Sequence, residues 1–381
     1  MTAAADALGL YIHLPWCEKK CPYCDFNSHE RERIPEVRYV EALLRDLDHD
    51  AALADGREIT SIFIGGGTPS LFSAAAIARL LEGVARRLAL SARVEITLES
   101  NPGSAEAGKF AGFRDAGVNR LSLGIQSFSD TSLRALGRVH DSGQALRAVE
   151  AARSAGFDNL NLDLMHGLPA QTVEGALADL RQALAVAPEH LSWYQLTIEP
   201  NTRFYSDPPL LPVEDTLARV ETEGGAMLAD GGFRRYEVSA YARDDRACRH
   251  NLGYWHFGDY LALGAGAHGK ITQADGDIWR YAKTRQPDAY LTAEPGQHTS
   301  QRRLLAAEEL PGEFMLNALR LDAGVAVAHF SAATGLPLDT IRPTVAALVD
   351  EGLLVSDTGL LRTTKLGHRF LDDVVERFFP D

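Results

Sequence analysis

Over roughly its first 230 residues, the chain alternates short apolar runs with longer stretches of helical periodicity. The runs expected to be strands are residues 8–14, 59–64, 94–98, 120–125, 160–165 and 191–198. The stretches expected to be helices are residues 37–53, 74–88, 107–116, 145–155, 173–185 and 216–230. Strands and helices in strict alternation predict an α/β fold with a parallel sheet, because parallel strands need crossover connections. We favour an open partial (β/α)6 barrel, although a doubly wound sheet would show the same alternation.

A different pattern follows the last of these units. Residues 243–269 are expected to form a loop with a strand or two, and residues 272–301 a polar connector. Helices are then expected over 307–319, 325–334 and 340–351, followed by a hairpin over 353–362 and a last helix over 365–378. This order predicts a small winged-helix-like α+β domain. The expected division is a barrel at 1–240, a barrel extension with a connector at 241–305, and the C-terminal domain at 306–381.

The charge of the chain argues against nucleic acid as a partner. A winged helix often binds DNA, but the third helix of this one carries three acidic residues against one basic residue and so lacks a basic recognition surface. These residues are Asp339, Asp350 and Glu351, with Arg342. The formal net charge of −14 also disfavours bulk electrostatic binding to polyanions.

The composition predicts a cytoplasmic protein. With only four cysteines there is no disulfide framework, which indicates a reducing compartment. The N-terminal residues 1–6 (MTAAAD) show no sign of a secretion signal. No segment approaches the roughly 18 uninterrupted apolar residues of a membrane-spanning helix.

Three of the cysteines, Cys17, Cys21 and Cys24, lie in one loop directly after the first expected strand, spaced CxxxCxxC. Iron–sulfur clusters are held by thiolates, usually four per cluster, so three thiolates can hold three irons and leave the fourth open. The alternatives are a zinc site or three unrelated core cysteines. Structural zinc prefers paired ligand motifs separated by a longer span, and the sequence has no second pair. The spacing therefore favours a [4Fe–4S] cluster.

Polar residues end the next four expected strands. Residues 65–69 (GGGTP) follow the second strand, where glycines allow the backbone to approach a ligand closely. Glu99 and Gln126 end the third and fourth strands, and Asp163 lies in the fifth. Any one of these residues taken alone fits a cap or a turn. Together they predict a site at the C-terminal mouth of the barrel.

The cysteine loop, the glycine turn and the polar strand ends together resemble the radical S-adenosylmethionine (SAM) superfamily. More narrowly, residues 11–17 (YIHLPWC) and 163–169 (DLMHGLP) are similar to the oxygen-independent coproporphyrinogen III oxidase group. The resemblance covers nearly the whole chain, and it implies that SAM chelates the open iron of the cluster and is cleaved by one electron. By matching motif, it assigns to these cofactors Tyr11, Tyr23, Gly66, Gly67, Thr68, Glu99, Gln126, Arg138, Asp163 and, more weakly, Thr197.

Within that group the chain resembles the HemW family of haem chaperones more than the oxidases. The pattern of the oxidases has a further cysteine two residues after the third, and in this chain that position is Phe26. The oxidases also have a long extension before the first barrel strand, whereas only about ten residues precede Tyr11 here. Residues 250–255 (HNLGYW) are similar to the HNxxYW motif of the HemW family. The resemblance implies haem as a further cofactor, with His250 at its site. It also implies donation of haem to respiratory proteins, with transient contact to the membrane surface.

Several alternatives remain open from the sequence. His250 also fits a hydrogen-bonded loop residue, and Cys248, His256 and His268 are competing haem ligands. An enzyme acting on coproporphyrinogen III or another tetrapyrrole is the alternative function. The sequence does not decide whether SAM is cleaved or whether two copies form a homodimer.

Overall fold

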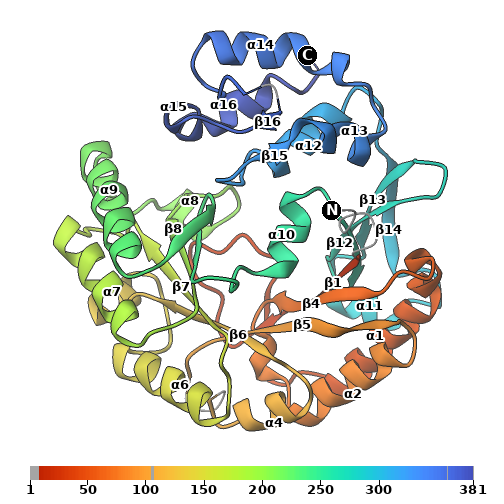
Figure 1. The fold of residues 1–381 in the computed structure, drawn as a ribbon. Coiled ribbons are helices and arrows are strands. Elements are labelled where there is room, and N and C mark those ends of the chain that lie inside the picture. The colour runs from red at the N-terminus through yellow and green to blue at the C-terminus, as the bar shows by residue number, and fades with distance from the viewer. Residues whose placement is uncertain (1–7, 104–106, 358, 381) are drawn as a thin grey trace.

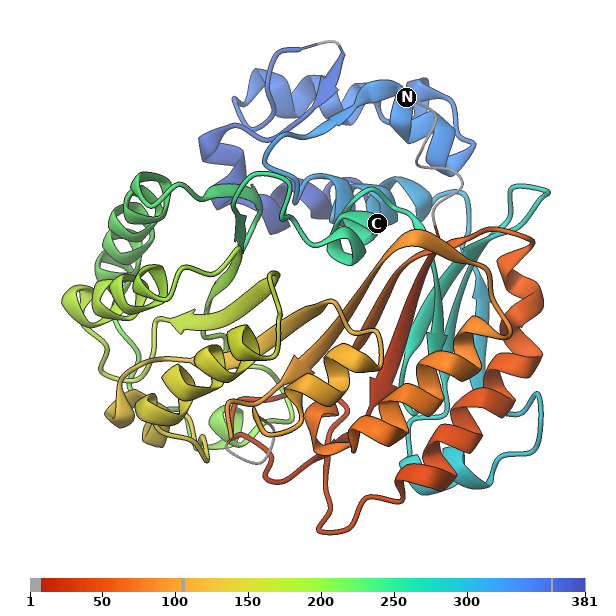
Figure 2. The ribbon, with the colours of Figure 1, turned by 60° about the horizontal axis from the view of Figure 1, so that its bottom comes forward.

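The architecture is that of a computed structural model that describes residues 8–103, 107–357 and 359–380. The expectation about a secretion signal concerned residues 1–6, and these lie outside the described residues. Residue 358 of the expected hairpin also lies outside them. One 12-stranded sheet curves through the molecule with helices along its outer face (Figure 1; Figure 2). Every helix that is described is too short or too polar to cross a membrane.

Parallel strands in chain order form the centre of this sheet, and each neighbouring pair is hydrogen-bonded in parallel. They are β1 (Leu8–Leu14), β4 (Ile59–Gly66), β5 (Leu90–Ser100), β6 (Arg120–Gln126), β7 (Leu160–His166) and β8 (His190–Gln195). The connecting helices include α1 (Glu36–Asp50), α2 (Ala74–Ala85), α4 (Phe110–Asp115), α6 (Ser142–Ser154), α7 (Val173–Ala185) and α9 (Glu214–Asp230). The α/β class and the partial (β/α)6 barrel are confirmed.

Local sequence signals set where several of these helices begin. The side chains of Ser73 and Thr172 accept hydrogen bonds from the first turns of α2 and α7. Asp141 and Gln144 form a reciprocal capping box at the start of α6. Such caps satisfy backbone N–H groups that have no partner inside the helix, so each loop ends and each helix begins at a defined residue.

The sheet extends beyond the barrel at both edges, and here the expected connector was wrong. Residues 272–301 are not a connector, because β13 (Ile278–Lys283) and β14 (Thr299–Leu304) continue the sheet on either side of α11 (Pro287–Thr292). They follow β11 (Asp259–Leu263), which pairs in parallel with β1, and β12 (His268–Thr272). Most of β14 is exposed at the sheet edge, so it lacks the apolar alternation that marks a half-buried strand. At the other edge lie β10 (Ala240–Ala242) and β9 (Arg234–Glu237).

The C-terminal part is a helical unit with a small sheet, as expected for a winged-helix-like domain. It contains α12 (Leu310–Ala318), α13 (Val327–Thr334), α14 (Arg342–Asp350), and β15 (Val325–Ala326) paired with β16 (Leu360–Leu361). The expected last helix is divided into α15 (Lys365–Arg369) and α16 (Leu371–Glu376), because the backbone at Phe370 leaves the helical region. Its core also takes in Phe257 and Ile278 from the preceding segment, so the boundary near residue 305 stays a prediction.

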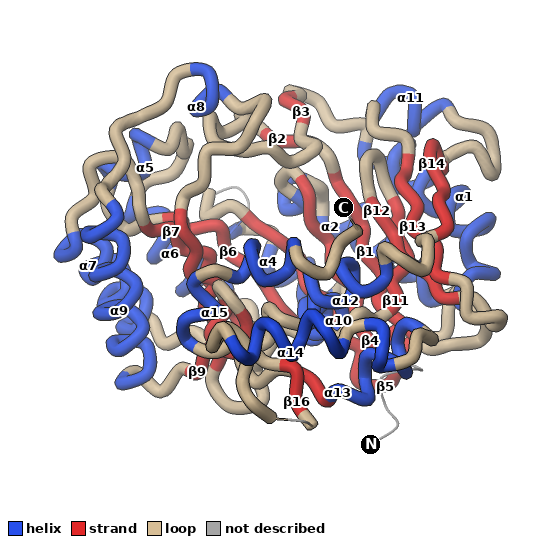
Figure 3. The backbone as a smooth tube through the Cα atoms, turned by 90° about the horizontal axis from the view of Figure 1, so that it is seen from above, coloured by secondary structure: helices blue, strands red, loops and turns tan. Residues whose placement is uncertain are grey.

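Short elements gather at the C-terminal ends of the parallel strands, while a helix closes the other end. β2 (Trp16–Cys17), β3 (His29–Glu30), α5 (Asp130–Ala135) and α8 (Arg203–Ser206) lie at the mouth of the barrel (Figure 3). The helix α10 (Arg249–Trp255) replaces part of the loop expected over 243–269. It lies inside the opening of the curved sheet, next to the C-terminal helices (Figure 1). We call this α10 end of the barrel the floor.

A buried ion cluster joins α1 to the sheet extension. The Lys283 ammonium lies 2.6 Å from the carboxylates of Asp46 and Asp50, and all three residues are at most 4% exposed. The Tyr290 hydroxyl also donates to Asp46. Burying these charges is costly, and it is offset only while the pairs and their hydrogen bonds are complete. The cluster therefore attaches β13 and α11 firmly to the first helix of the barrel.

We expect Lys283→Met to lower the free energy of unfolding by about 3–5 kcal/mol, because two carboxylates would remain buried without their cation. Urea denaturation measures this loss. The control is Arg79→Met, which breaks an exposed ion pair with Glu41 and should cost less than about 1 kcal/mol. Equal, small losses in both variants would contradict this account of the cluster.

Candidate functional site

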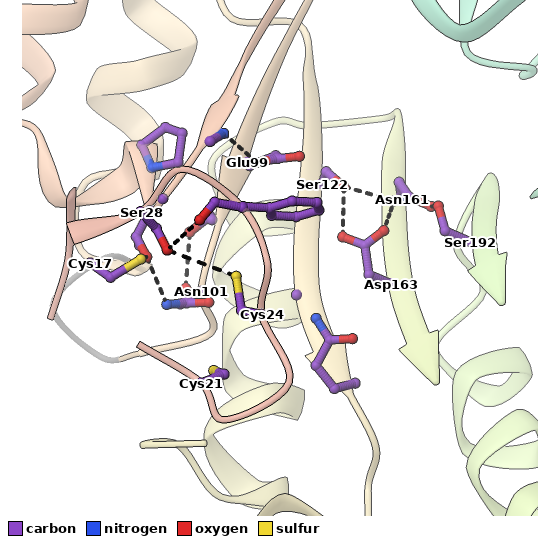
Figure 4. A pocket seen from close by; sticks show the side chains of 18 of the residues that line it. Cys17, Cys21, Cys24, Ser28, Glu99, Asn101, Ser122, Asn161, Asp163 and Ser192 are labelled. Carbon is purple, nitrogen blue, oxygen red and sulfur yellow. Dashed lines mark hydrogen bonds between the residues drawn. The ribbon is translucent and has the colours of Figure 1, made fainter. Parts of the chain in front are cut away.

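A cavity of about 340 Å³ lies between the cysteine loop, the inner face of the barrel strands and the start of α10. The cysteines surround one end of it, and Asp163 and Ser192 lie across from them (Figure 4). The structure brings most of the predicted site residues to this one cavity. They are Cys17, Cys21, Cys24, Tyr23, Gly66, Gly67, Thr68, Glu99, Gln126, Arg138 and Asp163.

All three cysteines of the loop line the cavity. A cubane takes one thiolate at each of three separate irons, so three cysteines on one loop are a donor set that suits it. Cys248 does not line the cavity; it is fully buried beside Glu95, and burial raises the pKa of its thiol to about 12.

Each thiol in the loop has a polar neighbour that suits a thiolate. Thr68 Oγ1 donates to Cys17 Sγ (3.5 Å), Arg138 Nη1 donates to Cys21 Sγ (3.5 Å), and Ser28 Oγ lies 3.8 Å from Cys24 Sγ. Donors aimed at sulfur stabilise its ionised form, whereas burial raises the pKa of the Cys17 and Cys24 thiols. Burial therefore favours protonated thiols at Cys17 and Cys24 in the free protein, while the polar neighbours of the loop are placed to stabilise thiolates.

The glycine turn fastens the start of the cysteine loop to the sheet. The Gly67 N–H donates to the carbonyl of Leu14, and the Thr68 N–H donates to that of Trp16. A Cβ on Gly67 would lie 2.5 Å from the Trp16 carbonyl oxygen, so only glycine fits there. These two N–H groups are therefore used inside the protein and are not free for a ligand.

Two carboxylates line the cavity from β5 and β7, the strands on either side of β6. Glu99 Oε2 accepts a hydrogen bond from the Gly66 N–H (3.1 Å), and Asp163 accepts from Ser122 and Asn161 (2.9 and 2.8 Å). Burial, and then the negative charge of Asp163, raises the pKa of Glu99 to about 8. Burial also raises the pKa of Asp163. A pair of this kind suits a ligand that carries positive charge, because a cation favours the ionised carboxylates.

Arg138 and Gln126 are held in place by several hydrogen bonds. Arg138 Nη2 donates to Asn101 Oδ1 (2.6 Å) and to the Gly124 carbonyl (2.8 Å). Gln126 accepts from the Tyr194 hydroxyl (2.9 Å) and has a φ of 68°, a left-handed conformation that is unusual at a strand end. Strained backbone of this sort is found where the surrounding structure holds a functional side chain in place.

Several residues that line the cavity were not predicted, although the alternation of polar and apolar residues along the strands would have identified them. On β6, Arg120, Ser122, Gly124 and Gln126 all line the cavity, while the intervening Leu121, Leu123 and Ile125 are fully buried toward the helices. Side chains in a strand alternate between the two faces, so this pattern marks an inward polar face. The same spacing places Asn161 with Asp163 on β7 and Ser192 with Tyr194 on β8.

Two of the residues assigned to SAM and the cluster lie outside the cavity lining. The hydroxyl of Tyr11 is hydrogen-bonded to Nδ1 of His13 (2.9 Å), and its ring packs against Phe63, which does line the cavity. Thr197 was expected at the end of the sixth strand, but β8 ends at Gln195 and Thr197 is exposed in the following loop.

His250 also lies outside the lining, on α10, and is 3% exposed. Its Nδ1 is hydrogen-bonded to Ser61 Oγ (2.9 Å) and its Nε2 to the Tyr254 hydroxyl (2.7 Å). Burial, and then the positive charge of Arg120, lowers the pKa of His250 to about 3, so the ring is neutral. The competing candidates His256 and His268 are exposed. His250 is therefore a hydrogen-bonded residue, as the alternative expected, but it lies on a helix and not in a loop.

Comparisons with known proteins agree with this architecture. Residues 11–183 match the model of the Radical SAM superfamily, and residues 305–370 match that of the HemN C-terminal domain. Among solved structures, the coproporphyrinogen III oxidase HemN from Escherichia coli superposes with a TM-score of 0.82. It covers 98% of this chain and 90% of its own at 23% identity, and this shows a shared fold.

Curated relatives match over the full length. The heme chaperone HemW of Escherichia coli K12 is 49% identical, and that of Haemophilus influenzae is 45% identical, each over 98% of both chains. A mouse protein described as radical S-adenosyl methionine domain-containing protein 1, mitochondrial, is 37% identical over 99% of this chain and 88% of its own. The chain therefore belongs to the HemW family of the radical SAM superfamily.

Proposed function

We propose that the protein is a haem chaperone that binds a [4Fe–4S] cluster, SAM and haem, and donates haem to respiratory proteins. The observation that carries this proposal is the full-length likeness to relatives named heme chaperones, at up to 49% identity. Phe26 adds support, because it occupies the position at which the oxidase pattern has a further cysteine. Its side chain lines the cavity and is 62% exposed. The proposed location is the cytoplasm, with contact to a membrane surface during transfer. Nucleic acid is not among the proposed partners.

Cys17, Cys21 and Cys24 would hold the cluster, and Thr68 and Arg138 would donate hydrogen bonds to its thiolates. When bound, such a cluster supplies a one-electron reductant beside the ligand at its open iron. The guanidinium of Arg138 also offsets the negative charge that three thiolates bring into a buried loop. These residues therefore bind and orient the cluster while the glycine turn keeps its loop against β1.

SAM would occupy the cavity next to the cysteine loop. Glu99 and Asp163 would accept hydrogen bonds from its amino group or its ribose hydroxyls, and Gln126 is held toward the same space by Tyr194. Gly66, Gly67 and Tyr23 would form the wall nearest the cysteines. Tyr11 would contribute indirectly, because its ring packs against Phe63, which lines the cavity. Thr197 would reach SAM only if its loop moved.

Haem ligation by His250 is the least direct part of the proposal. Neither ring nitrogen is free for iron, so a bond to haem would have to replace the contact with Tyr254 or with Ser61. The ring is already neutral, so no proton needs to leave it first. Tyr254 lies on the same helix four residues away, and a rotation of its side chain would release Nε2.

The test of function is a parallel assay on the anaerobically reconstituted protein. We expect a saturable Soret shift on titration with haem and no steady production of protoporphyrinogen IX from coproporphyrinogen III with SAM and a reductant. Cys24→Ser is the matched variant without a complete cluster. Steady turnover of coproporphyrinogen III would instead support the alternative, an oxygen-independent oxidase.

SAM affinity should depend on pH through Glu99. Below about pH 8 this carboxyl is protonated in the free protein, and a cationic ligand must displace that proton to pair with it. Affinity measured by calorimetry should therefore rise up to about tenfold per unit between pH 6 and pH 8 and level off above pH 8. Glu99→Gln is the control, because it lacks the titrating carboxyl. Any pH dependence of SAM affinity that remains in this variant comes from SAM itself or from other groups of the protein. Identical profiles for both proteins would contradict this role of Glu99.

Tyr254→Phe tests whether His250 Nε2 ligates haem. Removing the hydroxyl frees Nε2, so we expect haem affinity, followed by the Soret titration, to rise several-fold. His250→Ala should weaken it, and Tyr260→Phe, which removes a hydroxyl from the neighbouring ring, is the control. Unchanged haem binding in both Tyr254→Phe and His250→Ala would move the haem site elsewhere, with His256 and His268 as the next variants.

A further inference from the structure

Arg120 is a buried cation that lines the cavity at its floor, on the first residue of β6. The residue is 2% exposed, yet its guanidinium forms no hydrogen bond or ion pair with any residue in the described ranges. A guanidinium carries five N–H donors, and buried charges in proteins are normally paired and hydrogen-bonded. The floor of the cavity therefore presents unused donors.

The nearest carboxylates are committed to other donors. Glu95 Oε1 accepts from the backbone N–H groups of Arg249 (2.9 Å) and His250 (3.3 Å) at the start of α10. Both oxygens of Asp163 accept from side chains of β6 and β7. These carboxylates balance the charge of Arg120 at longer range but leave its N–H groups without an acceptor.

The rest of the cavity wall favours a negatively charged group at this point. Arg138 already donates to Cys21, to Asn101 and to a backbone carbonyl, so its donors are largely used. Asn251, the second residue of the HNxxYW motif, lines the cavity, and no side-chain hydrogen bond to it is formed within the described part of the chain. The floor thus offers a guanidinium fork and a free amide, which together match a carboxylate.

We infer that the floor of the cavity is a carboxylate subsite, in which Arg120 and Asn251 bind a carboxylate of the ligand that enters the cavity. The inference rests on the proposed function and adds the group that the cavity recognises. The carboxylate is a propionate of haem, because the carboxylate of SAM is the group expected to chelate the open iron at the cysteine end of the cavity. A propionate would place its anionic oxygens against the donors that the protein leaves unpaired.

Paired probes test the subsite without any variant. The reconstituted wild-type protein is titrated, in the presence of SAM, with haem and with haem dimethyl ester. We expect haem to bind about tenfold or more tightly than its ester, as for the loss of a hydrogen bond to a charged group. If the two bind equally, the subsite is wrong, while the proposed function stands. If neither SAM nor haem binds at all, the proposed function itself fails.

Variants then test whether Arg120 and Asn251 cause the preference for the ligand with a free carboxylate. Arg120→Gln and Asn251→Ala should each reduce the preference for the carboxylate form, and Arg120→Lys should keep part of it because it keeps the charge. The matched control is Arg134→Gln, which removes an exposed arginine on α5. Cluster absorbance and thermal unfolding check that each variant is intact; if Arg120→Gln is not, Asn251→Ala decides. A preference that survives in both intact variants overturns the inference.

Discussion

The site depends on a parallel sheet that has a different chemistry on each of its two faces. Parallel strands are covered by their crossover helices on one face, so the residues on that face must be apolar. In this protein the other face is curved inward and encloses a cavity, so the alternate residues are free to be polar. Leu121, Leu123 and Ile125 hold β6 against the helices, and this lets Arg120 and Gln126 be placed at opposite ends of one cavity. The hydrophobic core thus positions the polar site.

The helix α10 completes this arrangement by filling the end of the barrel away from the cysteines. His250 connects it to β4 through Ser61, and Glu95 of β5 accepts hydrogen bonds from its first backbone N–H groups. The HNxxYW motif therefore has a structural role in this protein whatever its role toward haem. Its histidine fastens the helix to the sheet, and its asparagine reaches the cavity.

The alternating units of the barrel were readable from the sequence because each strand and helix carries its own period. The strands after Tyr241 were harder to predict. β14 is an edge strand with nearly every residue exposed, so nothing in its composition distinguishes it from a loop. α10 is short and only His250 of its residues is fully buried, so its helical period is weak. Each of these elements is stabilised by neighbours that are distant in sequence, such as β13 for β14 and β4 for α10.

The sequence by itself determined the α/β class, the cysteine loop and the polar residues at the strand ends, because each depends on local spacing or on side-chain chemistry. Tertiary structure alone decided which of those residues share one cavity, since β-strands far apart in the chain meet only in the folded sheet. It placed Thr197 outside the lining and brought in Asn251. It also decided the state of His250, because one of its partners is far away in the chain and the other shares a helix in a segment that was expected to be mainly a loop. Ser61 lies 189 residues away, and Tyr254 becomes a neighbour only once α10 forms.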